Sequence, residues 1–371
     1  MMDRLRIDRL RIRPYDLPLR RAWRSARGGF ERRHGWLVSA ETDGAVGFGD
    51  CAPIPAAGTE DPESAESALL DARDFAPGRS TGEFLEMLDR GFAATPAARC
   101  ALECALLDLV SQAECVPLRR MLAGDATDVV PVNGILGALA TLTATDLEQA
   151  AAAGFRVVKL KIGVDEPSSE IARLMALALV VPADIRLRLD ANGAWGFAEA
   201  CRILDRLAGL PIESLEEPLR IPDPSLLHAL QERAGFPLAR DESLAGLAPD
   251  ADLAELGVSR IVIKPAVIGG LRSALDLSRR AAIAGIEVVI TGVVESAAGL
   301  WPAAQLAAAT GSRLPHGLAT ADWLAEDLGV SPCLNGGRLL LSDRPGSGFK
   351  LYPDADLNPI PESRKEQSDY E

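Results

Sequence analysis

The chain has 371 residues, of which 48% are hydrophobic, so it is long enough for more than one domain with a large core. Its formal net charge of −14 argues against nucleic acid as a partner, because binding to phosphates needs a basic surface. No apolar run approaches the roughly 18 residues of a membrane span and the start lacks an apolar signal stretch, so we expect no membrane partner and a cytoplasmic location.

The first 50 residues predict a β-rich module. Residues 4–15 alternate between polar and apolar side chains, residues 36–41 form a second strand-like run, and Asp43-Gly44 supplies a turn. Between the two runs, the basic and glycine-containing stretch Arg20–Arg33 is typical of a loop. A second loop is expected at Cys51–Asp61, which is rich in proline and alanine.

Helical patterns follow at about 62–75 and 80–92. The clearest helix begins at Thr95-Pro96, where threonine is a typical N-cap and proline a typical first helical residue. Apolar residues then recur every three or four positions. We expect residues 1–125 to form one α+β module.

From Val129 to about residue 317, strand-like runs alternate with helical patterns, which indicates repeated βαβ units. An amphipathic helix fits in each gap, so we expect an α/β fold with a (β/α)8 or TIM-like barrel at 126–317. The segment 318–371 should pack back on the first module, with a frayed polar tail at 359–371. The expected barrel strands lie near 130–136, 156–162, 185–190, 212–217, 237–241, 260–264, 286–291 and 312–316.

The six cysteines indicate neither disulfides nor a zinc site. Cys100 and Cys104 are four apart within a helical pattern, too far for a Cys-x-x-Cys motif, and no histidine lies near them. We expect reduced thiols, as is usual in the cytosol, at all of these positions: Cys51, Cys100, Cys104, Cys115, Cys201 and Cys333.

Three carboxylates close successive apolar runs, namely Asp190, Glu216 and Asp241. Because all strands of such a barrel run parallel, their C-terminal ends meet at the face where these barrels perform chemistry. Carboxylates are the ligands that Mg²⁺ prefers, and Mn²⁺ or Ca²⁺ would fit the same set. Any one of them could instead cap the next helix, but three in register favour a metal site.

Lys159 and Lys161 are two positions apart, so on a strand both side chains point to the same face. Two lysines inside a barrel would be costly to desolvate without a function, and one cation should lower the pKa of the other so that an amine can act as a base. Lys264 closes a later run and should reach in from the opposite side, or else cover the rim of the barrel. With a metal ion binding a substrate carboxylate, a lysine on either side could remove the α-proton.

The remaining polar candidates are less specific. Glu295 follows the seventh run and either orients Lys264 or begins a helix. Among the histidines His34, His228 and His316, a structural role is favoured for His316 over a place at the barrel mouth.

These residues resemble the enolase superfamily over essentially the whole chain. Lys159-Leu160-Lys161 is similar to its Lys-x-Lys motif, and Lys264 to its sixth-strand lysine. The resemblance implies an α+β capping domain, completed by the C-terminal segment, over a (β/α)8 barrel with bound Mg²⁺ or Mn²⁺. It favours the muconate-lactonising subgroup, since the catalytic histidine of the mandelate-racemase subgroup is missing. The motifs that match the metal ligands are Asp190-Ala191-Asn192, Glu216-Glu217-Pro218 and Asp241-Glu242-Ser243.

Within the subgroup, several stretches resemble the o-succinylbenzoate synthase family: 187–195, 262–265 and 316–320. This implies dehydration of a succinyl-bearing cyclohexadiene carboxylate in menaquinone biosynthesis, with Lys161 as base and then acid and Lys264 as a cation that stabilises the enediolate. The partner would be a small carboxylate substrate, and a homo-oligomer is left open. Thr291-Gly292 departs from the serine-rich run of some synthases. The expected substrate contacts are Lys159, Asn192, Thr291, Gly292 and Glu295.

Other activities remain open. The same subgroup includes N-acylamino-acid racemases, cycloisomerases and dipeptide epimerases, although Ala321-Asp322-Trp323 does not supply the epimerases' Asp-x-Asp. A Schiff-base aldolase or a non-catalytic ligand-binding barrel are alternatives from other classes. Substrate identity should depend on Arg20–Arg33 and Cys51–Asp61, which we expect to cover the barrel mouth.

Overall fold

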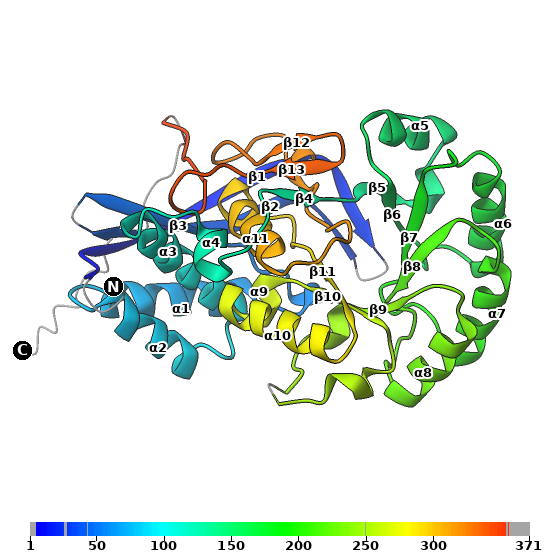
Figure 1. Ribbon diagram of the computed structural model, residues 1–371, viewed down its shortest axis with the longest axis horizontal. Helices are drawn as coiled ribbons and strands as arrows, with labels where there is room; N and C mark the ends of the chain where they lie inside the picture. The colour runs from blue at the N-terminus through cyan, green and yellow to red at the C-terminus, as the bar shows by residue number, and fades with distance from the viewer. Residues whose placement is uncertain (1–4, 26–27, 43, 249, 354, 356–371) are drawn as a thin grey trace, which may run out of the picture.

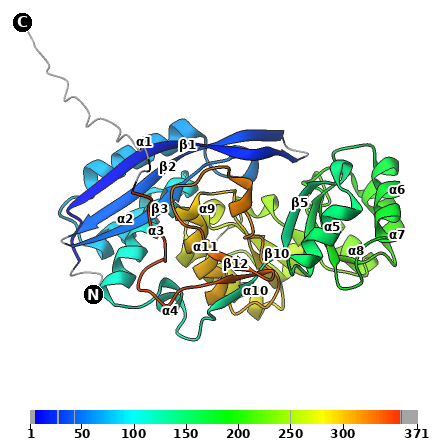
Figure 2. The same cartoon turned by 90° about the horizontal axis from the view of Figure 1, so that it is seen from above.

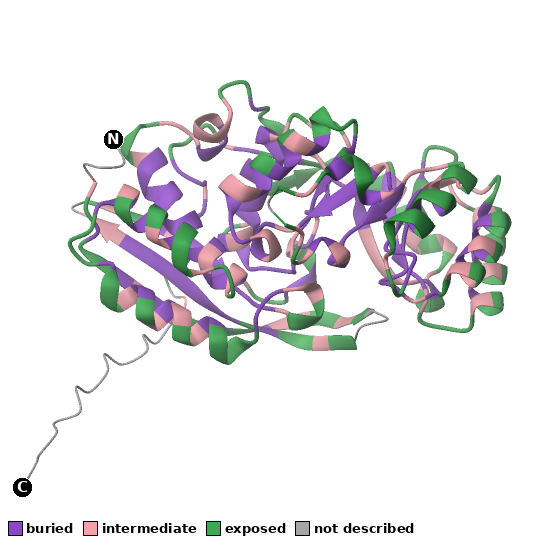
Figure 3. Ribbon diagram, turned by 90° about the horizontal axis from the view of Figure 1, so that it is seen from below, coloured by how far each residue is buried: buried purple, intermediate pink, exposed green. Residues whose placement is uncertain are grey.

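The computed structural model describes residues 5–25, 28–42, 44–248, 250–353 and 355. An antiparallel sheet with its helices occupies one end of the molecule, and parallel strands flanked by helices occupy the other (Figure 1). Figure 3 shows that most of the parallel sheet and the inner faces of the helices are buried, while the outer helix faces are exposed. No helix in the described part of the chain is long and apolar enough to cross a membrane.

The N-terminal module is a three-stranded antiparallel sheet covered by helices. Its strands are β1 (Arg9–Ser25), β2 (Gly28–Thr42) and β3 (Ala45–Cys51), and its helices are α1 (Pro62–Phe75), α2 (Thr81–Gly91), α3 (Pro96–Ala113) and α4 (Leu118–Leu122). Helix α3 lies directly on β3. A Cβ at Gly47 or Gly49 would come within 2.1 and 1.9 Å of the carbonyl oxygens of Ala105 and Ala101, so this packing needs glycine.

The prediction of a loop at Arg20–Arg33 is wrong for most of that stretch. Strands β1 and β2 pair through it as a long hairpin, from Arg9 opposite Glu41 to Ser25 opposite Gly28, with a register shift between Pro18 and Trp23. The two aromatic residues of this stretch are cross-strand partners, and Trp23 stacks on Phe30 across the hairpin. The hairpin therefore extends from its own sheet toward the parallel strands (Figure 2).

The predicted helices of this module are confirmed, with one difference at α3. Thr95 is the N-cap residue and Pro96 begins the helix, but the threonine side chain makes no capping bond. Instead, the Glu60 carboxylate accepts hydrogen bonds from Ala97 N (2.9 Å) and Ala98 N (2.8 Å). A residue from the predicted loop Cys51–Asp61 thus caps the central helix.

Seven parallel strands form a curled sheet in the order β11-β10-β9-β8-β7-β6-β5. They are β5 (Gly134–Ala138), β6 (Val157–Lys161), β7 (Arg186–Asp190), β8 (Ile212–Glu216), β9 (Leu238–Arg240), β10 (Arg260–Ile263) and β11 (Glu287–Ile290). The helices that accompany them are α5 (Ala144–Ala152), α6 (Pro167–Ala178), α7 (Phe197–Leu207), α8 (Pro224–Arg233), α9 (Pro265–Ile268), α10 (Leu271–Ile283) and α11 (Ala297–Ala309).

The expected regular alternation fails at three places. The first expected strand is divided between β4 (Val129–Pro131), which belongs to a small antiparallel sheet, and β5. Among the described residues between β9 and β10, two short 3-10 helices, η3 (Glu242–Leu244) and η4 (Leu253–Leu256), stand in place of an α-helix. The eighth expected strand, 312–316, forms isolated bridges in place of a ladder, because Pro315 has no N–H to donate.

Residues 315–317 nevertheless connect the two edges of the curled sheet. His316 forms a parallel bridge with Val132, just before β5, and Gly317 forms one with Thr291, just after β11. Side chains supply the remaining bonds: Thr291 Oγ1 donates to Gly317 O (2.9 Å), and His316 Nδ1 accepts from Ile290 N (2.8 Å). The histidine is fully buried, so the structural role that the sequence favoured is the one it has.

The C-terminal segment returns to the N-terminal module. Strand β12 (Cys333–Asn335) pairs with β13 (Arg338–Leu340), which pairs with β4. Ala325 N donates to Pro18 O (2.8 Å), and Ser347 N donates to Asp108 Oδ1 (2.6 Å). The six cysteines are free thiols. The tail predicted to fray, 359–371, lies outside the described residues.

We expect His316→Leu to lower the free energy of unfolding at pH 7 by about 1–3 kcal/mol, because the buried Ile290 N–H loses its acceptor. Burial, followed by the nearby Arg188 charge, lowers the pKa of His316 to about 3 from an ordinary 6.5. A depressed histidine pKa means that the folded state resists protonation, so stability falls as the pH drops below 6.5. From pH 7 to 5 the wild type should lose about 2 kcal/mol that the variant keeps.

Urea denaturation at the two pH values measures both effects. The matched control is His228→Leu on the exposed face of α8, which should leave the stability at pH 7 unchanged. If His316→Leu is as stable as the wild type at pH 7, the histidine does not hold the two sheet edges together.

Candidate functional site

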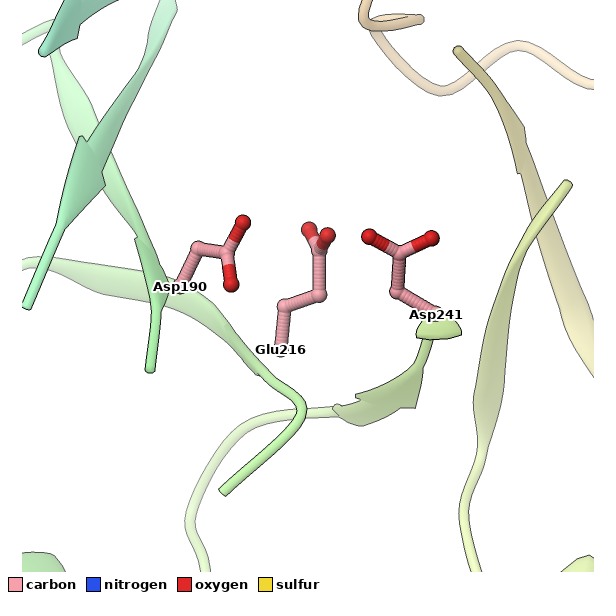
Figure 4. A group of neighbouring side chains, drawn as sticks. All are labelled: Asp190, Glu216 and Asp241. Atoms are coloured by element: carbon pink, nitrogen blue, oxygen red, sulfur yellow. The ribbon is translucent and has the colours of Figure 1, made fainter. Parts of the chain in front are cut away.

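Three carboxylates meet at the C-terminal ends of neighbouring parallel strands (Figure 4). Asp190 ends β7, Glu216 ends β8, and Asp241 follows β9 directly. Lys161, Asp190 and Glu216 are paired in register across β6, β7 and β8, so their side chains emerge at one level. The carboxylates are all buried, and one oxygen of each lies within 4.8 Å of the others.

Two lysines from β6 contact this group. Lys159 Nζ lies 2.7 and 2.8 Å from the two carboxylate oxygens of Glu216 and 2.8 Å from Asp190 Oδ2. Lys161 Nζ donates to Asp190 Oδ2 (2.6 Å) and to Asn192 Oδ1 (2.9 Å). Their spacing of two positions along the strand, read from the sequence, thus brings both amines to the Asp190 carboxylate.

Lys264 approaches from the other side. It follows β10 and donates from Nζ to Asp241 Oδ2 at 2.5 Å. The amines of Lys161 and Lys264 are therefore held by the first and the last carboxylate of the row. The alternative in which Lys264 merely covers the rim does not fit a buried ion pair with Asp241.

The charges act strongly on one another because the site is dry. Burial alone would lower the pKa of Lys159, but Asp190 and Glu216 outweigh burial and the pKa is raised. The pKa of Lys264 is raised for the same reason by Asp241, although Lys159 opposes this. For Lys159, the expectation that a neighbouring cation lowers the pKa is therefore wrong, because the carboxylates raise it.

The carboxylates themselves show why a cation fits here. Burial and the neighbouring Asp190 raise the pKa of Glu216, against the effect of Lys159. Burial also raises the pKa of Asp241, with Lys264 opposing. Carboxylates that repel one another this strongly gain from an additional positive charge. Oxygen donors at this spacing suit a hard divalent ion, so Asp190, Glu216 and Asp241 would hold it.

Two strained residues shape the ends of the strands. Asn192 (φ 46°) and Glu217 (φ 45°) both lie in the left-handed region, which is uncommon for non-glycine residues. Asn192 bridges the site, since its Oδ1 accepts from Lys161 and its Nδ2 donates to Glu242 Oε1 (2.6 Å). Asn192, expected as a substrate contact, is therefore also a partner of the expected base.

Glu217 has a role that the sequence did not reveal. Its Oε2 accepts from Asp241 N (2.7 Å), Ser243 N (3.2 Å) and Ser243 Oγ (3.1 Å). It therefore fixes the turn that presents Asp241 as a ligand. The doubled Glu216-Glu217 was the available signal, because two adjacent carboxylates at a strand end cannot both point into one site.

A cavity of about 280 Å³ opens above the carboxylates. It is lined from both parts of the chain, so the expectation that the stretches Arg20–Arg33 and Cys51–Asp61 cover the strand ends is confirmed. Of the expected substrate contacts, Lys159, Asn192, Thr291 and Gly292 line this cavity.

Glu295 is not among the lining residues. It is buried directly behind Gly292, where a Cβ would lie 2.2 Å from Glu295 Oε2. Burial raises the pKa of its carboxyl group. No ion pair joins it to Lys264 within the described residues, and α11 begins two residues later with Ser296 as N-cap. Glu295 therefore lies behind the cavity wall, where it neither pairs with Lys264 nor begins helix α11.

Aromatic side chains from the hairpin and the C-terminal segment form the outer wall. Trp23 lies edge-on to Trp323 with ring centroids 4.8 Å apart, and Arg21 sits 4.0 Å above the Trp323 ring. Lys161 Nζ is 5.7 Å from the centre of the Trp23 ring. These contacts were missed in the sequence because the hairpin was taken for a loop.

Comparison with known proteins agrees with this geometry. Residues 143–355, more than half of the chain, match the family model described as Enolase C-terminal domain-like. The chain belongs to the enolase superfamily.

Relatives of different activity are similarly close. An o-succinylbenzoate synthase from Desulfotalea psychrophila is 31% identical and covers 90% of this chain and 99% of its own. A dipeptide epimerase from Methylococcus capsulatus, solved with Mg and the dipeptide L-Arg-D-Lys, is 28% identical with a TM-score of 0.84 and covers 94% of this chain and 100% of its own. A muconate lactonizing enzyme from Pseudomonas fluorescens is 26% identical with a TM-score of 0.84 and covers 94% and 97%.

We expect Glu217→Gln to weaken Mn²⁺ or Mg²⁺ binding by about 10–100-fold, because a neutral amide oxygen accepts the three bonds that orient Asp241 more weakly than the carboxylate does. Isothermal titration with each metal measures the affinity. Glu232→Gln on exposed α8 is the matched control and should bind metal like the wild type. Unchanged affinity in a folded Glu217→Gln variant would show that Asp241 needs no such support.

Proposed function

We propose that this chain is a Mg²⁺-dependent, cytoplasmic o-succinylbenzoate synthase of menaquinone biosynthesis. The reaction is the syn-dehydration of 2-succinyl-6-hydroxy-2,4-cyclohexadiene-1-carboxylate. The relative from Desulfotalea psychrophila, similar over nearly the whole length of both chains, supports this choice. We also propose that the curled sheet, with residues 316–317 between its edges, is a (β/α)8 barrel, and that residues 1–125 and 318–371 form its capping domain.

The observation that carries the proposal is the charge of the cavity lining. Among its described residues, the carboxylates are Glu216, Asp241 and Glu242, which all lie at the strand ends. The wall farther out offers Trp23, Phe30 and Trp323 with the exposed cation Arg24. A free substrate ammonium group would find no carboxylate there, whereas an apolar ring and a distal carboxylate both find partners.

The lysines fit the bond changes of this dehydration. Lys161 is placed to accept the proton from the carbon that bears the ring carboxylate. It can then return that proton to the hydroxyl group leaving from the same face, so that the C–H and C–O bonds break, a C=C bond forms and water departs. Lys264, held by Asp241, stays positively charged and stabilises the negative charge that develops on the carboxylate oxygens. A bound Mg²⁺ would supply further positive charge at those oxygens.

A second candidate, N-acylamino-acid racemisation, is favoured by one specific feature. Racemisation needs a base on each face of the α-carbon, and Lys161 and Lys264 approach the cavity from opposite ends of the carboxylate row. An acylated amino acid also lacks the ammonium group that the cavity wall does not accommodate.

A substrate panel tests the proposal. With Mg²⁺ or Mn²⁺, we expect the purified protein to dehydrate the succinyl-cyclohexadiene carboxylate, and EDTA to abolish turnover until metal is restored. N-succinyl amino acids and dipeptides are assayed in parallel for exchange of the α-proton with deuterated solvent. Racemisation without dehydration would favour the second candidate over the proposal. Full activity after exhaustive chelation would show that the reaction needs no metal ion.

Substitution of either lysine of the site should lower kcat, whereas substitution of a surface lysine should not. Lys161→Ala should lower kcat by at least about 10²–10⁴-fold, because a positioned general base contributes that much. Lys264→Arg keeps the charge but misplaces it, and should also lower kcat. Lys350→Ala, on the exposed surface, is the matched control. Single-turnover dehydration and deuterium exchange measure these effects, and a folded Lys161→Ala enzyme within tenfold of the wild type would exclude Lys161 as the base.

A further inference from the structure

One wall of the cavity is held in a strained conformation. Residues Thr291–Val294 line the cavity between β11 and α11. Val294 has φ 61°, in the left-handed region, where a β-branched residue is an outlier. Such a conformation persists only where the surroundings impose it, and residues of this kind gather at functional sites.

The contacts that impose this conformation on Val294 come from the N-terminal sheet. Arg33 of β2 is 4% exposed, and its Nε donates to Val294 O at 3.1 Å. The same guanidinium donates from Nη2 to Ala52 O (2.5 Å), so it is anchored on its own side. The bond to Val294 thus fixes the carbonyl of the strained residue from the far side of the domain boundary.

A second contact fixes the next turn. Asp50 of β3 accepts from Ser296 N (2.7 Å) and Ser296 Oγ (2.6 Å) through Oδ2. Its other oxygen accepts from Tyr15 OH at 2.5 Å, which orients the carboxylate. The strained residue is therefore held on both sides, at its own carbonyl and at Ser296, by two buried charged residues of the N-terminal module.

We propose that Arg33 and Asp50 are positioning residues that hold the Val294 wall in its left-handed conformation and thereby set how tightly the cavity binds the distal part of the substrate. Neither residue lines the cavity, so both act through Val294 and Ser296. The inference rests on the proposed function only for the choice of substrate, because the wall borders the cavity whichever α-proton is removed there.

The variants are Arg33→Gln and Asp50→Asn, each with a matched control. Arg32→Gln removes the neighbouring arginine, which pairs with Asp16 on the exposed face. Asp108→Asn removes a buried carboxylate that also bonds two backbone amides, Phe48 N and Ser347 N, but lies outside the cavity lining. Thermal unfolding confirms that each variant is folded before its kinetics are compared.

We expect KM for the succinyl-cyclohexadiene carboxylate to rise at least tenfold in Arg33→Gln and Asp50→Asn, with kcat within threefold and metal affinity unchanged. The controls should leave KM unchanged. In a Val294→Gly background, where the left-handed conformation carries no steric cost, Arg33→Gln should raise KM less than threefold. KM and kcat falling together, or equal effects of Arg33→Gln in both backgrounds, would overturn the proposal.

Hydrogen exchange without substrate separates this proposal from the assigned reaction. The Ser296 amide, bonded to Asp50, should exchange at least tenfold faster in Asp50→Asn than in the wild type or in Asp108→Asn. If the wild type fails to dehydrate the substrate but this exchange responds, the proposed function is wrong and the positioning role stands, with KM then measured for the substrate that reacts. Unchanged exchange in folded Asp50→Asn would overturn the positioning role itself.

Discussion

The close approach of three buried carboxylates is the constraint on which the rest of the site depends. With oxygens of Asp190, Glu216 and Asp241 within 4.8 Å of one another and almost no water to screen them, their repulsion must be balanced locally. Three lysine amines provide this balance, so carboxylates and amines form one alternating cluster. A divalent ion held by these carboxylates would add its charge next to oxygens that the lysine amines already contact.

The strand ends alone cannot make this cluster work, because they open outward to water. The hairpin of β1 and β2 closes them with Trp23 and Phe30, and the C-terminal segment adds Trp323 to the same wall. Arg33 and Asp50 then connect the antiparallel sheet to the segment after β11. The N-terminal module therefore both covers the cavity and contacts one of its walls, although the carboxylates and lysines of the cluster all lie on parallel strands or directly after them.

The spacing of charged residues predicted which of them meet in the site, because parallel strands bring residues far apart in sequence to one edge. That regularity located Asp190, Glu216, Asp241 and the lysines without any knowledge of their contacts. It could not locate the Arg33–Val294 contact, whose partners are 261 positions apart and belong to no repeated pattern. Local propensity failed in the same way at Arg20–Arg33, where pairing across the hairpin outweighed glycines and arginines, and at Thr95, where Glu60 supplied the cap.

The similarity of this chain to relatives of different activity is consistent with a division of roles between the cluster at the strand ends and the cavity wall. Removing a proton next to a carboxylate needs only the cluster at the strand ends, which lyases, racemases and epimerases of one superfamily can share. What happens after the proton is removed depends on which side chain returns it and on what the substrate carries, either a leaving hydroxyl group or none. Those features are decided by the cavity wall, where this chain offers aromatic rings, an arginine and a strained valine. If the proposed function holds, the wall, more than the shared cluster, is therefore where the substrate preference of this protein is set.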